Sequence, residues 1–194
     1  ALKKFGSGPG ASRLICGSFK FHKDLEEKIA KFKHSQSALV FNCGYMANLA
    51  ISALTDKDSV IFSDKFNHAS IVDALILSRA NFIRYNHGDM GNLEELLKKY
   101  NAANKKLIVT DTVFSMDGDL ANLKKIVSLA KKYRSFVYVD EAHATGVFGP
   151  SGAGLVEELG LTQKIDIQMG TLSKALGSFG AFVAGSKTLI EYLI

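Results

Sequence analysis

The sequence has 194 residues, of which 47% are hydrophobic and 22% are charged, a composition typical of a globular chain long enough for one domain with a full core. It contains no apolar run near the roughly 18 residues of a membrane-spanning helix and no basic-then-apolar leader, so we expect neither a membrane protein nor a secreted one. The formal net charge is +5, but the lysines are spread along the expected helices, which indicates solvated faces more than a nucleic-acid patch. That charge also suits anionic substrates.

The cysteines and the two ends give further expectations. Cys16 and Cys43 have neither metal-like nor redox-motif spacing, and two ordinary thiols fit a reducing cytosol, so we expect a cytoplasmic protein. The first residue is Ala1 rather than methionine, and the apolar pattern still runs at residues 192–194. Both features predict that the sequence is a fragment of a longer chain.

Helices and strands are expected to alternate along the chain. Residues 1–20 form a glycine-rich segment that we expect to be irregular, because no good strand precedes its glycines as a dinucleotide-binding loop would require. Helical spacing of apolar residues predicts helices at 21–32, at 45–54, from 63–67 to 77, at 93–100 and from the loop 111–119 to about 133. Short apolar runs predict strands at 38–41, 59–62, 81–85, 107–110, 136–139, 165–169 and 179–184.

This alternation sets the expected architecture. Strands joined to helices by short loops predict a mainly parallel α/β sheet with helices on both faces. The last strand arrives without a helical crossover, so an antiparallel direction is open to it. Ligands of such sheets bind beyond the carboxyl ends of the strands, and the candidate residues are therefore those that follow each strand.

Lys174 stands in the short segment 170–180, between two expected strands and among small residues. A buried ammonium without a partner is costly, so two interpretations compete. Lys174 is either a strand-end lysine that extends its amine to water, or a Schiff-base lysine whose amine reacts and whose pKa the pocket lowers from its usual value of about 10.4. The other residues that follow strands decide between the two.

Three loops supply candidate partners. Gly44 and Tyr45 begin a helix after the first strand, where backbone N–H groups and the helix dipole favour a phosphate, although most such helix starts bind nothing. His68 begins the next helix, either as a cap or as an imidazole that stacks on an aromatic ligand. Asp111 and Ser115 follow the fourth strand, where a turn carboxylate and a hydroxyl bonded to its own backbone are the plain alternatives.

Asp140 directly follows four apolar strand residues, so its poorly solvated carboxylate is expected to have a cationic partner. His143 lies three residues on, and an Asp and a His on one loop can hold opposite edges of a single ring. Residues 140–143 also spell the Asp-Glu-Ala-His signature of nucleic-acid helicases, but the phosphate loop that should precede it is absent from the sequence. The segment GAFVAGSKT at 180–188 comes near that loop, yet Ser186 breaks the spacing and the segment lies downstream.

Together these residues match the needs of pyridoxal 5′-phosphate (PLP). A lysine amine can bond its aldehyde, and a buried carboxylate can keep its ring nitrogen protonated, so that the ring acts as an electron sink. Hydroxyl and imidazole groups can hold its phenolic oxygen, and a helix start can hold its phosphate. The combination is far more specific than any of its parts, and the sequence therefore predicts a PLP site.

With these residues in place, the chain resembles the α-oxoamine synthases, which are PLP enzymes of fold type I, and within them the branch that acts in biotin biosynthesis. The resemblance rests on the segments GSGPGASRLICGS (6–18), FNCGYMANLA (41–50), DKFNHAS (64–70), TDTVFSMDGD (110–119), VDEAHATGVFGPSGAG (139–154) and GTLSKALGSFGAFVAG (170–185). It implies an aspartate aminotransferase-like large domain at 21–194 after the segment 1–20, with the C-terminal small domain absent from this chain. It also implies a cytoplasmic homodimer.

The resemblance implies a role for each matching residue. Lys174 would form the internal aldimine with PLP and remove the α-proton of the substrate, and Asp140 would pair with the ring nitrogen. His143 and Ser115 would hold the phenolic oxygen, while His68 would stack over the ring. Lys174, His68 and His143 would thus be the catalytic residues.

The phosphate of PLP would be bound by the backbone of Gly44 and Tyr45 together with Thr171. The implied reaction condenses L-alanine with a pimeloyl thioester, carried by CoA or by an acyl carrier protein. The carbanion attacks the thioester, the thiol leaves, and loss of carbon dioxide gives an aminoketone. No metal, nucleic acid or membrane is expected as a partner.

Three alternatives remain within this resemblance: glycine C-acetyltransferase, another α-oxoamine synthase, and a non-catalytic homologue or fragment. Glycine C-acetyltransferases more often have Asp-Asp-Ser-His where this chain has Asp-Glu-Ala-His at 140–143. Asp111 stands where the family usually has Glu, which weakens any role given to that carboxylate. Leu14 stands where 5-aminolevulinate synthases have a polar residue, which argues against that enzyme.

Overall fold

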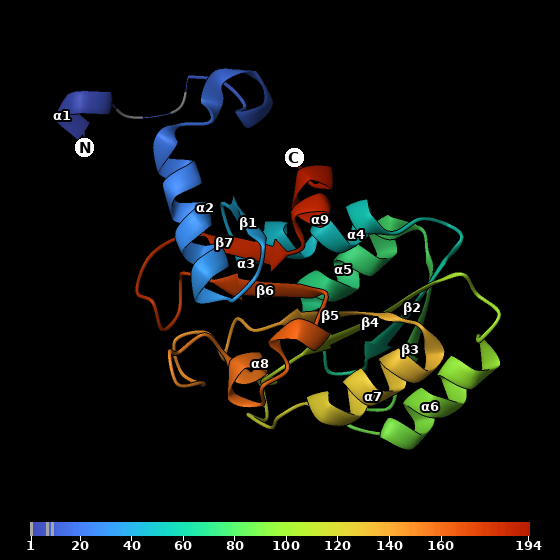
Figure 1. The fold of residues 1–194 in the computed structure, drawn as a ribbon. Coiled ribbons are helices and arrows are strands. Elements are labelled where there is room, and N and C mark those ends of the chain that lie inside the picture. Colours follow the sequence, from blue (N-terminus) through green and yellow to red (C-terminus); the bar gives the residue numbers. More distant parts are fainter. Residues whose placement is uncertain (1, 7, 9) are drawn as a thin grey trace.

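The computed structural model describes residues 2–6, 8 and 10–194, and it places one sheet between two layers of helices (Figure 1). Ala1, Ser7 and Pro9 belong to the predicted N-terminal segment and lie outside the described residues. The rest of that segment contains two short turns of helix, α1 (Leu2–Phe5) and the π-helical η1 (Arg13–Gly17). Both lie beyond the start of α2, away from the sheet, and Arg13 of η1 forms an ion pair with Glu26 of α2.

The strands of the described residues form a single seven-stranded sheet with the spatial order β1-β7-β6-β5-β4-β2-β3. They are β1 (Ser37–Phe41), β2 (Ser59–Asp64), β3 (Asn81–Tyr85), β4 (Lys105–Asp111), β5 (Phe136–Asp140), β6 (Ile167–Thr171) and β7 (Ala181–Gly185). β7 is antiparallel to both of its neighbours, and the other pairs are parallel. The predicted mainly parallel sheet is confirmed, and the last strand takes the antiparallel direction that was open to it.

The helices that follow η1 are α2 (Lys20–Phe32), α3 (Gly44–Asn48), α4 (Ala50–Leu54), α5 (Ala69–Ser78), α6 (Met90–Lys99), α7 (Leu123–Tyr133), α8 (Leu155–Glu158), the 3-10 turn η2 (Thr162–Lys164) and α9 (Lys187–Tyr192). The helix expected at 45–54 is divided into α3 and α4 at Leu49. The Ser52 hydroxyl donates to the Leu49 carbonyl oxygen at 2.7 Å, a side-chain bond that competes with the helical ladder. The short elements α8, η2 and α9 were not predicted.

Successive residues of a strand point to opposite faces of the sheet. Because consecutive strand residues are apolar, both faces of the sheet are apolar. Val60 and Phe62 of β2 pack in one core with residues of α6 and α7, whereas Ile61 between them packs in a second core with residues of α4 and α5. A third, smaller cluster joins α2 to β1 and β7, where Phe182 is fully buried. This double covering explains the continuous apolar runs from which the strands were predicted.

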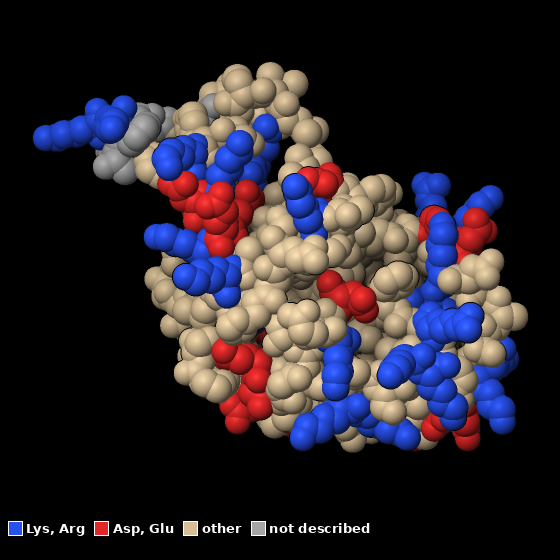
Figure 2. Space-filling model, in the orientation of Figure 1, with Lys and Arg blue, Asp and Glu red and all other residues tan. Residues whose placement is uncertain are grey.

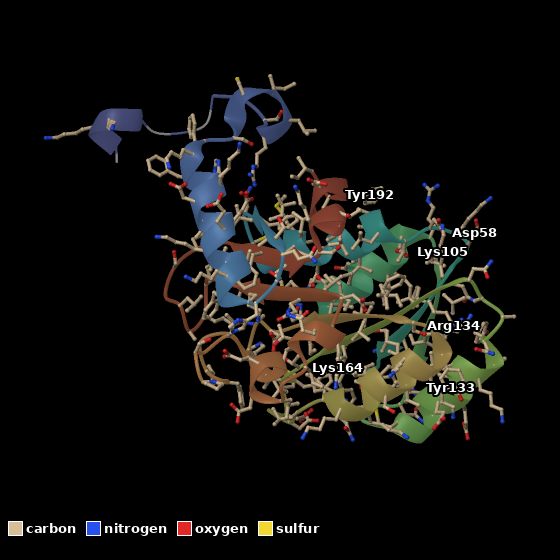
Figure 3. The ribbon with its side chains drawn as sticks, viewed as in Figure 1. Asp58, Lys105, Tyr133, Arg134, Lys164 and Tyr192 are labelled. Carbon is tan, nitrogen blue, oxygen red and sulfur yellow. The ribbon has the colours of Figure 1, made fainter. Side chains whose placement is uncertain are left out.

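α7 shows how the helices are fixed at their ends. The Asn122 side chain accepts the Lys125 backbone N–H at 3.2 Å and caps its start. Arg134 takes the left-handed conformation, with φ of 53°, and ends the helix by donating its backbone N–H to the Ala130 carbonyl oxygen (Figure 3). Because Asn122 also closes the long loop after β4, this cap positions the part of the chain that carries Ser115.

The charged side chains are distributed over the surface. On the face shown in Figure 2, Lys and Arg side chains lie over several elements, and Asp and Glu side chains lie among them. In the part of the chain that the structure describes, no helix is both long enough and apolar enough to cross a membrane.

Candidate active site

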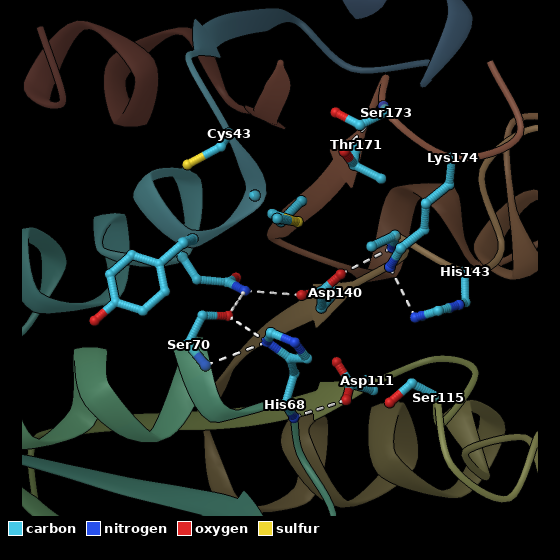
Figure 4. A pocket seen from close by; sticks show the side chains of 15 residues that line it. Cys43, His68, Ser70, Asp111, Ser115, Asp140, His143, Thr171, Ser173 and Lys174 are labelled. Atoms are coloured by element: carbon cyan, nitrogen blue, oxygen red, sulfur yellow. Dashed lines mark hydrogen bonds between the residues drawn. The ribbon is translucent and has the colours of Figure 1, made fainter. Parts of the chain in front are cut away.

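A cavity of about 350 Å³ opens at the edge of the sheet where β4, β5 and β6 end. Helices α3 and α5 begin at the same edge, so their first turns complete its wall (Figure 4). The cavity is lined by Cys43, Gly44, Tyr45, Asn48, His68, Ser70, Asp111, Ser115, Asp140, Ala142, His143, Met169, Thr171, Ser173 and Lys174. Every residue that was predicted from the sequence as a site residue is among them.

Lys174 lies on the loop between β6 and β7, and its side chain reaches toward the loop after β5. Its Nζ is 2.7 Å from Nε2 of His143. Burial lowers the pKa of Lys174, although the negative charges of Asp140 and Asp111 oppose this effect. Burial and the charge of Lys174 also lower the pKa of His143. The arrangement therefore favours an amine that donates a hydrogen bond to a neutral imidazole and that loses its own proton readily.

Asp140 is the last residue of β5 and is only 4% exposed. Its Oδ2 accepts from Nδ2 of Asn48 at 2.8 Å, and its Oδ1 accepts from the backbone N–H of Ala142 at 2.8 Å. Both donors are neutral, and among the described residues no ion pair includes this carboxylate. A buried carboxylate without a cation is costly, so this side of the cavity is suited to a cationic ligand group.

Asp111 stands beside Asp140, because the two residues are register partners at the ends of β4 and β5. Burial and the charge of Asp140 raise the pKa of Asp111 to about 8. Its Oδ2 accepts the backbone N–H of His68 at 2.9 Å, and its own N–H donates to Oδ1 of Asn67 at 2.9 Å. Asp111 thus ties the end of β4 to the turn that begins α5.

His68 caps α5 with its side chain and also lines the cavity. Its Nδ1 accepts the Ser70 backbone N–H at 3.2 Å and lies 2.8 Å from the Ser70 hydroxyl. Ser70 Oγ in turn accepts from Nδ2 of Asn48 at 2.8 Å, and Oδ1 of Asn48 accepts from the Tyr138 hydroxyl at 2.8 Å. One polar chain therefore runs from His68 to Asp140, and it fixes the imidazole that the sequence left open between a cap and a ligand contact.

The start of α3 and the end of β6 form the opposite wall. Gly44 packs so close to Met169 that a Cβ added to it would lie 3.1 Å from the methionine Cε. The Thr171 hydroxyl donates to the Gly180 carbonyl oxygen at 3.0 Å, and the Ser173 hydroxyl donates to the same oxygen at 3.2 Å. Hydroxyl protons of this wall are thus engaged within the β6–β7 loop, and Gly44 and Tyr45 at the start of α3 line the cavity beside them.

Asn48 and Ser70 are buried polar residues of the cavity that were not predicted from the sequence, and Cys43 and Ser173 also line it. Asn48 is 1% exposed and sits four positions after Gly44, on the same face of α3. Its signal was an amide within the otherwise apolar stretch 45–54, which must find partners once buried. Ser70 had a weaker signal, because a serine two residues after a helix cap is common in any helix.

The cavity fits PLP in chemical terms. Asp140 offers a buried and unpaired negative charge for the protonated ring nitrogen, and Lys174 offers an amine of lowered pKa for the aldehyde. His143 lies beside the amine, and Ser115 lines the cavity next to Asp111, as Figure 4 shows; both could form hydrogen bonds to the ring oxygen. The fold and this set of donors define the chain as the large domain of a PLP-dependent transferase of fold type I.

Comparison with known proteins gives the family. The family model described as "Aminotransferase class I and II" matches residues 1–194, and the chain belongs to that family. It is 56% identical to an 8-amino-7-oxononanoate synthase of Citrifermentans bemidjiense, over 98% of this chain and 49% of the relative. It is 53% identical to the enzyme of the same name from Geobacter sulfurreducens, over 100% of this chain and 50% of the relative. The chain thus spans about half the length of the curated relatives it matches.

Solved structures agree on the fold. A serine palmitoyltransferase variant from S. paucimobilis, solved with a bound PLP–myriocin aldimine, superposes with a TM-score of 0.93 at 40% identity, over 98% of this chain and 48% of that one. An 8-amino-7-oxononanoate synthase from Francisella tularensis gives a TM-score of 0.84 at 33% identity, over 100% of this chain and 53% of that one. The likeness to a PLP-bound protein agrees with the chemistry of the cavity.

Proposed function

We propose that the protein is a PLP-dependent C-acyltransferase that joins L-alanine to a pimeloyl thioester and gives 8-amino-7-oxononanoate in biotin biosynthesis. A carbon–carbon bond forms between the α-carbon of alanine and the acyl carbon, while the thiol and carbon dioxide leave. PLP, when bound, supplies the electron sink that stabilises the carbanion. The observation that carries the proposal is the Lys174 amine beside His143, on the same cavity as a buried and unpaired Asp140.

In this proposal each residue has a defined role. Lys174 holds the cofactor and then, as a neutral base, accepts the α-proton of alanine. His143 Nε2 accepts a hydrogen bond from Lys174 Nζ. Together with Ser115, His143 holds the phenolic oxygen of the cofactor. Asp140 keeps the ring nitrogen protonated, and His68 stacks over the ring. The presence of all five side chains around one cavity supports these assignments.

The phosphate is assigned to the other wall. Backbone N–H groups of Gly44 and Tyr45 would hold it, with the hydroxyl of Thr171 as a further contact once its bond to Gly180 is exchanged. We also propose that the large domain covers residues 21–194, and that the protein acts in the cytoplasm as a homodimer. The exposed apolar side chains of Leu14 and Ile15, 72% and 79% accessible, support a partner chain at that end.

Serine palmitoyltransferase chemistry is the second candidate. The superposition on the PLP-bound enzyme is closer than that on the F. tularensis synthase. Sequence identity favours the first candidate, since the relatives named 8-amino-7-oxononanoate synthase reach 53% and 56%. A change of amino acid substrate requires few altered contacts on one fold, so the product has to decide.

The test is a visible spectrum followed by product analysis. The protein with added PLP should show an absorbance band near ~420 nm, because the absorbing species is a lysine imine. Lys174→Ala should lack that band, whereas Lys164→Ala, in the surface turn η2 away from the cavity (Figure 3), should keep it. A band in both alanine variants would show that Lys174 is not the reacting lysine.

Mass analysis of products with a pimeloyl thioester then separates the candidates. Of the amino acids tested with this thioester, only alanine should be consumed, and the product should be 8-amino-7-oxononanoate. Turnover with serine would favour the palmitoyltransferase-like chemistry, and turnover with glycine and an acetyl thioester would favour glycine C-acetyltransferase. Binding of PLP without any of these products would leave a cofactor-binding homologue without turnover.

A further inference from the structure

His87 occupies a place outside the cavity that connects two of its loops. It lies in the turn between β3 and α6 and is bonded through both ring nitrogens. Nδ1 is 2.9 Å from Oδ1 of Asp64, the last residue of β2, and Nε2 is 2.8 Å from Oδ2 of Asp119. Asp64 precedes the turn that presents His68, and Asp119 belongs to the loop that presents Ser115. One ring thus bridges the two loops.

Aromatic contacts repeat the same bridge. The ring of His87 stacks on Phe66, with centroids 4.2 Å apart and planes 12° from parallel. It also meets Phe114 edge to face, with centroids 4.5 Å apart. Phe66 lies two residues before His68, and Phe114 lies directly before Ser115. Each loop therefore gives His87 one carboxylate and one aromatic ring.

Both aspartates also accept hydrogen bonds from the backbone near the cavity, Asp64 through its carboxylate and Asp119 through its main-chain carbonyl. Oδ1 of Asp64 accepts the Phe66 N–H at 2.8 Å, and the Asp119 carbonyl oxygen accepts the Phe114 N–H at 3.0 Å. A shift of either aspartate would therefore move Phe66, two residues before His68, or Phe114, directly before Ser115. The contacts form a continuous mechanical path from His87 to both of these cavity residues.

Only a protonated His87 can donate to both carboxylates. Burial lowers the pKa of His87, but the hydrogen bonds and charges of Asp64 and Asp119 outweigh it and raise that pKa overall. The other charged groups around this turn are directed elsewhere. Lys65 donates to Oδ1 of Asn86, and Arg84 donates to the Lys65 carbonyl oxygen. Loss of the ring proton would leave one of the two loops without its bond.

We propose that His87 is a positioning residue that clamps the β2–α5 and β4–α7 loops together and so sets the placement of His68 and Ser115 across the cavity. The roles of those two residues rest on the proposed function, whereas the clamp itself is a property of the protein without cofactor. Since the contribution of a group with a raised pKa is lost as the pH rises through that pKa, the clamp should hold below the pKa of His87 and release above it.

The experiment uses the cofactor-free protein and two variants. His87→Phe keeps a ring between Phe66 and Phe114 but removes both hydrogen bonds, and Asp119→Asn, at a partly exposed side chain, removes one charge. His22→Phe on α2 is the matched control. Histidine NMR locates the titration midpoint of His87, which should lie above about 6.5 and should fall in Asp119→Asn. An unshifted midpoint in the wild type would overturn the proposal.

Hydrogen exchange then reads the loops directly. The amides of Phe66 and Phe114, corrected for intrinsic rates, should exchange about tenfold faster two pH units above the midpoint than two units below it, the factor that one charge-assisted hydrogen bond supplies. His87→Phe should show the fast rate at both pH values, and His22→Phe should behave as wild type. A His87→Phe protein that keeps the slow rate would overturn the clamp.

Binding of PLP separates this proposal from the proposed function. The dissociation constant of PLP should rise about tenfold in His87→Phe and stay unchanged in His22→Phe. A wild-type protein that binds no PLP would refute the proposed function, while the exchange rates would still decide the clamp. Equal PLP affinity in wild type and His87→Phe, with altered exchange, would refute the link between clamp and cavity.

Discussion

Two carboxylates at the ends of neighbouring strands dominate the electrostatics of the cavity. Asp140 and Asp111 are register partners, both are buried, and among the described residues neither has an ion pair. Burial and the repulsion from Asp140 raise the pKa of Asp111 to about 8. Lys174 is the nearby group that both carboxylates favour in its charged form. A cationic ligand on Asp140 would relieve this strain more fully than the lysine does.

Asp111→Asn should therefore stabilise the cofactor-free protein, because the amide keeps an oxygen for the His68 N–H and removes the buried charge. A carboxyl whose pKa is about 8 when folded and about 3.9 when unfolded costs stability that grows as the pH rises between these values. The increase in the free energy of unfolding should be negligible near pH 4 and on the order of 2–4 kcal/mol at pH 9. Thermal unfolding at both pH values measures it.

The control is Asp117→Asn, an exposed residue of the same loop. Its melting temperature should differ little from that of the wild type at either pH, since surface substitutions seldom matter. A melting temperature of Asp111→Asn that falls below wild type at pH 9 would mean that the charge of Asp111 is compensated in the folded protein, contrary to the argument above.

At the scale of elements, a buried ion pair fixes the loop that follows β5. Lys33, which caps the end of α2, donates to Oε2 of Glu141 and to the Ala153 carbonyl oxygen, and both charged side chains are fully buried. Oε1 of Glu141 accepts the Val156 N–H at 2.9 Å. Gly154 leaves the space for this carboxylate, and its φ of +126° suits glycine. The loop that carries Asp140 and His143 is thereby fixed to α2 and α8.

Glu141→Gln should lower the free energy of unfolding by about 3–5 kcal/mol, because it leaves the Lys33 ammonium buried without a counter-charge. The double variant Lys33→Met with Glu141→Gln should recover part of that loss, since no unpaired charge remains and the amide oxygen can still accept from Val156. Denaturant unfolding measures both. Lys31→Met, on the exposed side of the same helix, is the control and should change little.

A double variant no more stable than Glu141→Gln alone would show that the loop needs the ion pair itself rather than charge balance. The coupling energy between Lys33 and Glu141 also requires the single variant Lys33→Met, because it is the loss in the double variant minus the sum of the two single losses.

Sequence patterns sufficed for the sheet and for most of the helices. Apolar runs located the strands because both faces of the sheet are covered, and residues after strand ends located the predicted cavity residues because parallel strands end at one edge. The division of the helix at Leu49 was not predicted, because the hydrogen bond of the Ser52 hydroxyl beside it leaves no mark on the apolar pattern. The ion pair between Lys33 and Glu141 was not predicted either, because local sequence patterns do not indicate which distant residues come into contact.

At the scale of the whole molecule, the two main cores are separated by the sheet. Ile71 of α5 lies in the core on one side, and Ile126 of α7 lies in the core on the other, each fully buried. Residues that share no contacts affect stability independently. The two cores are nevertheless parts of one cooperative unit, because the same strands supply side chains to both.

Ile71→Val and Ile126→Val should each lower the free energy of unfolding by about 1 kcal/mol, the cost of one buried methylene. The double variant should lose the sum of the two within about 0.5 kcal/mol, in a single transition. Denaturant unfolding followed by circular dichroism and by tyrosine fluorescence checks both points. Two separated transitions would mean that the helix layers unfold independently, against the shared-sheet architecture.

The pairing of β1 with β7 has a consequence for biosynthesis. The register joins Ser37 to Gly185, so the early strand β1 has its ladder partner on β7, the last of the described strands along the chain. While the ribosome extends the chain through residues 42–180, β1 has to remain an unpaired, apolar edge. The Lys174 loop closes only when β7 docks between β1 and β6, so a nascent chain acquires its cavity in the same event that joins the described strands into one sheet. A pause in translation before residue 181 would therefore expose both an aggregation-prone strand and an unassembled active site.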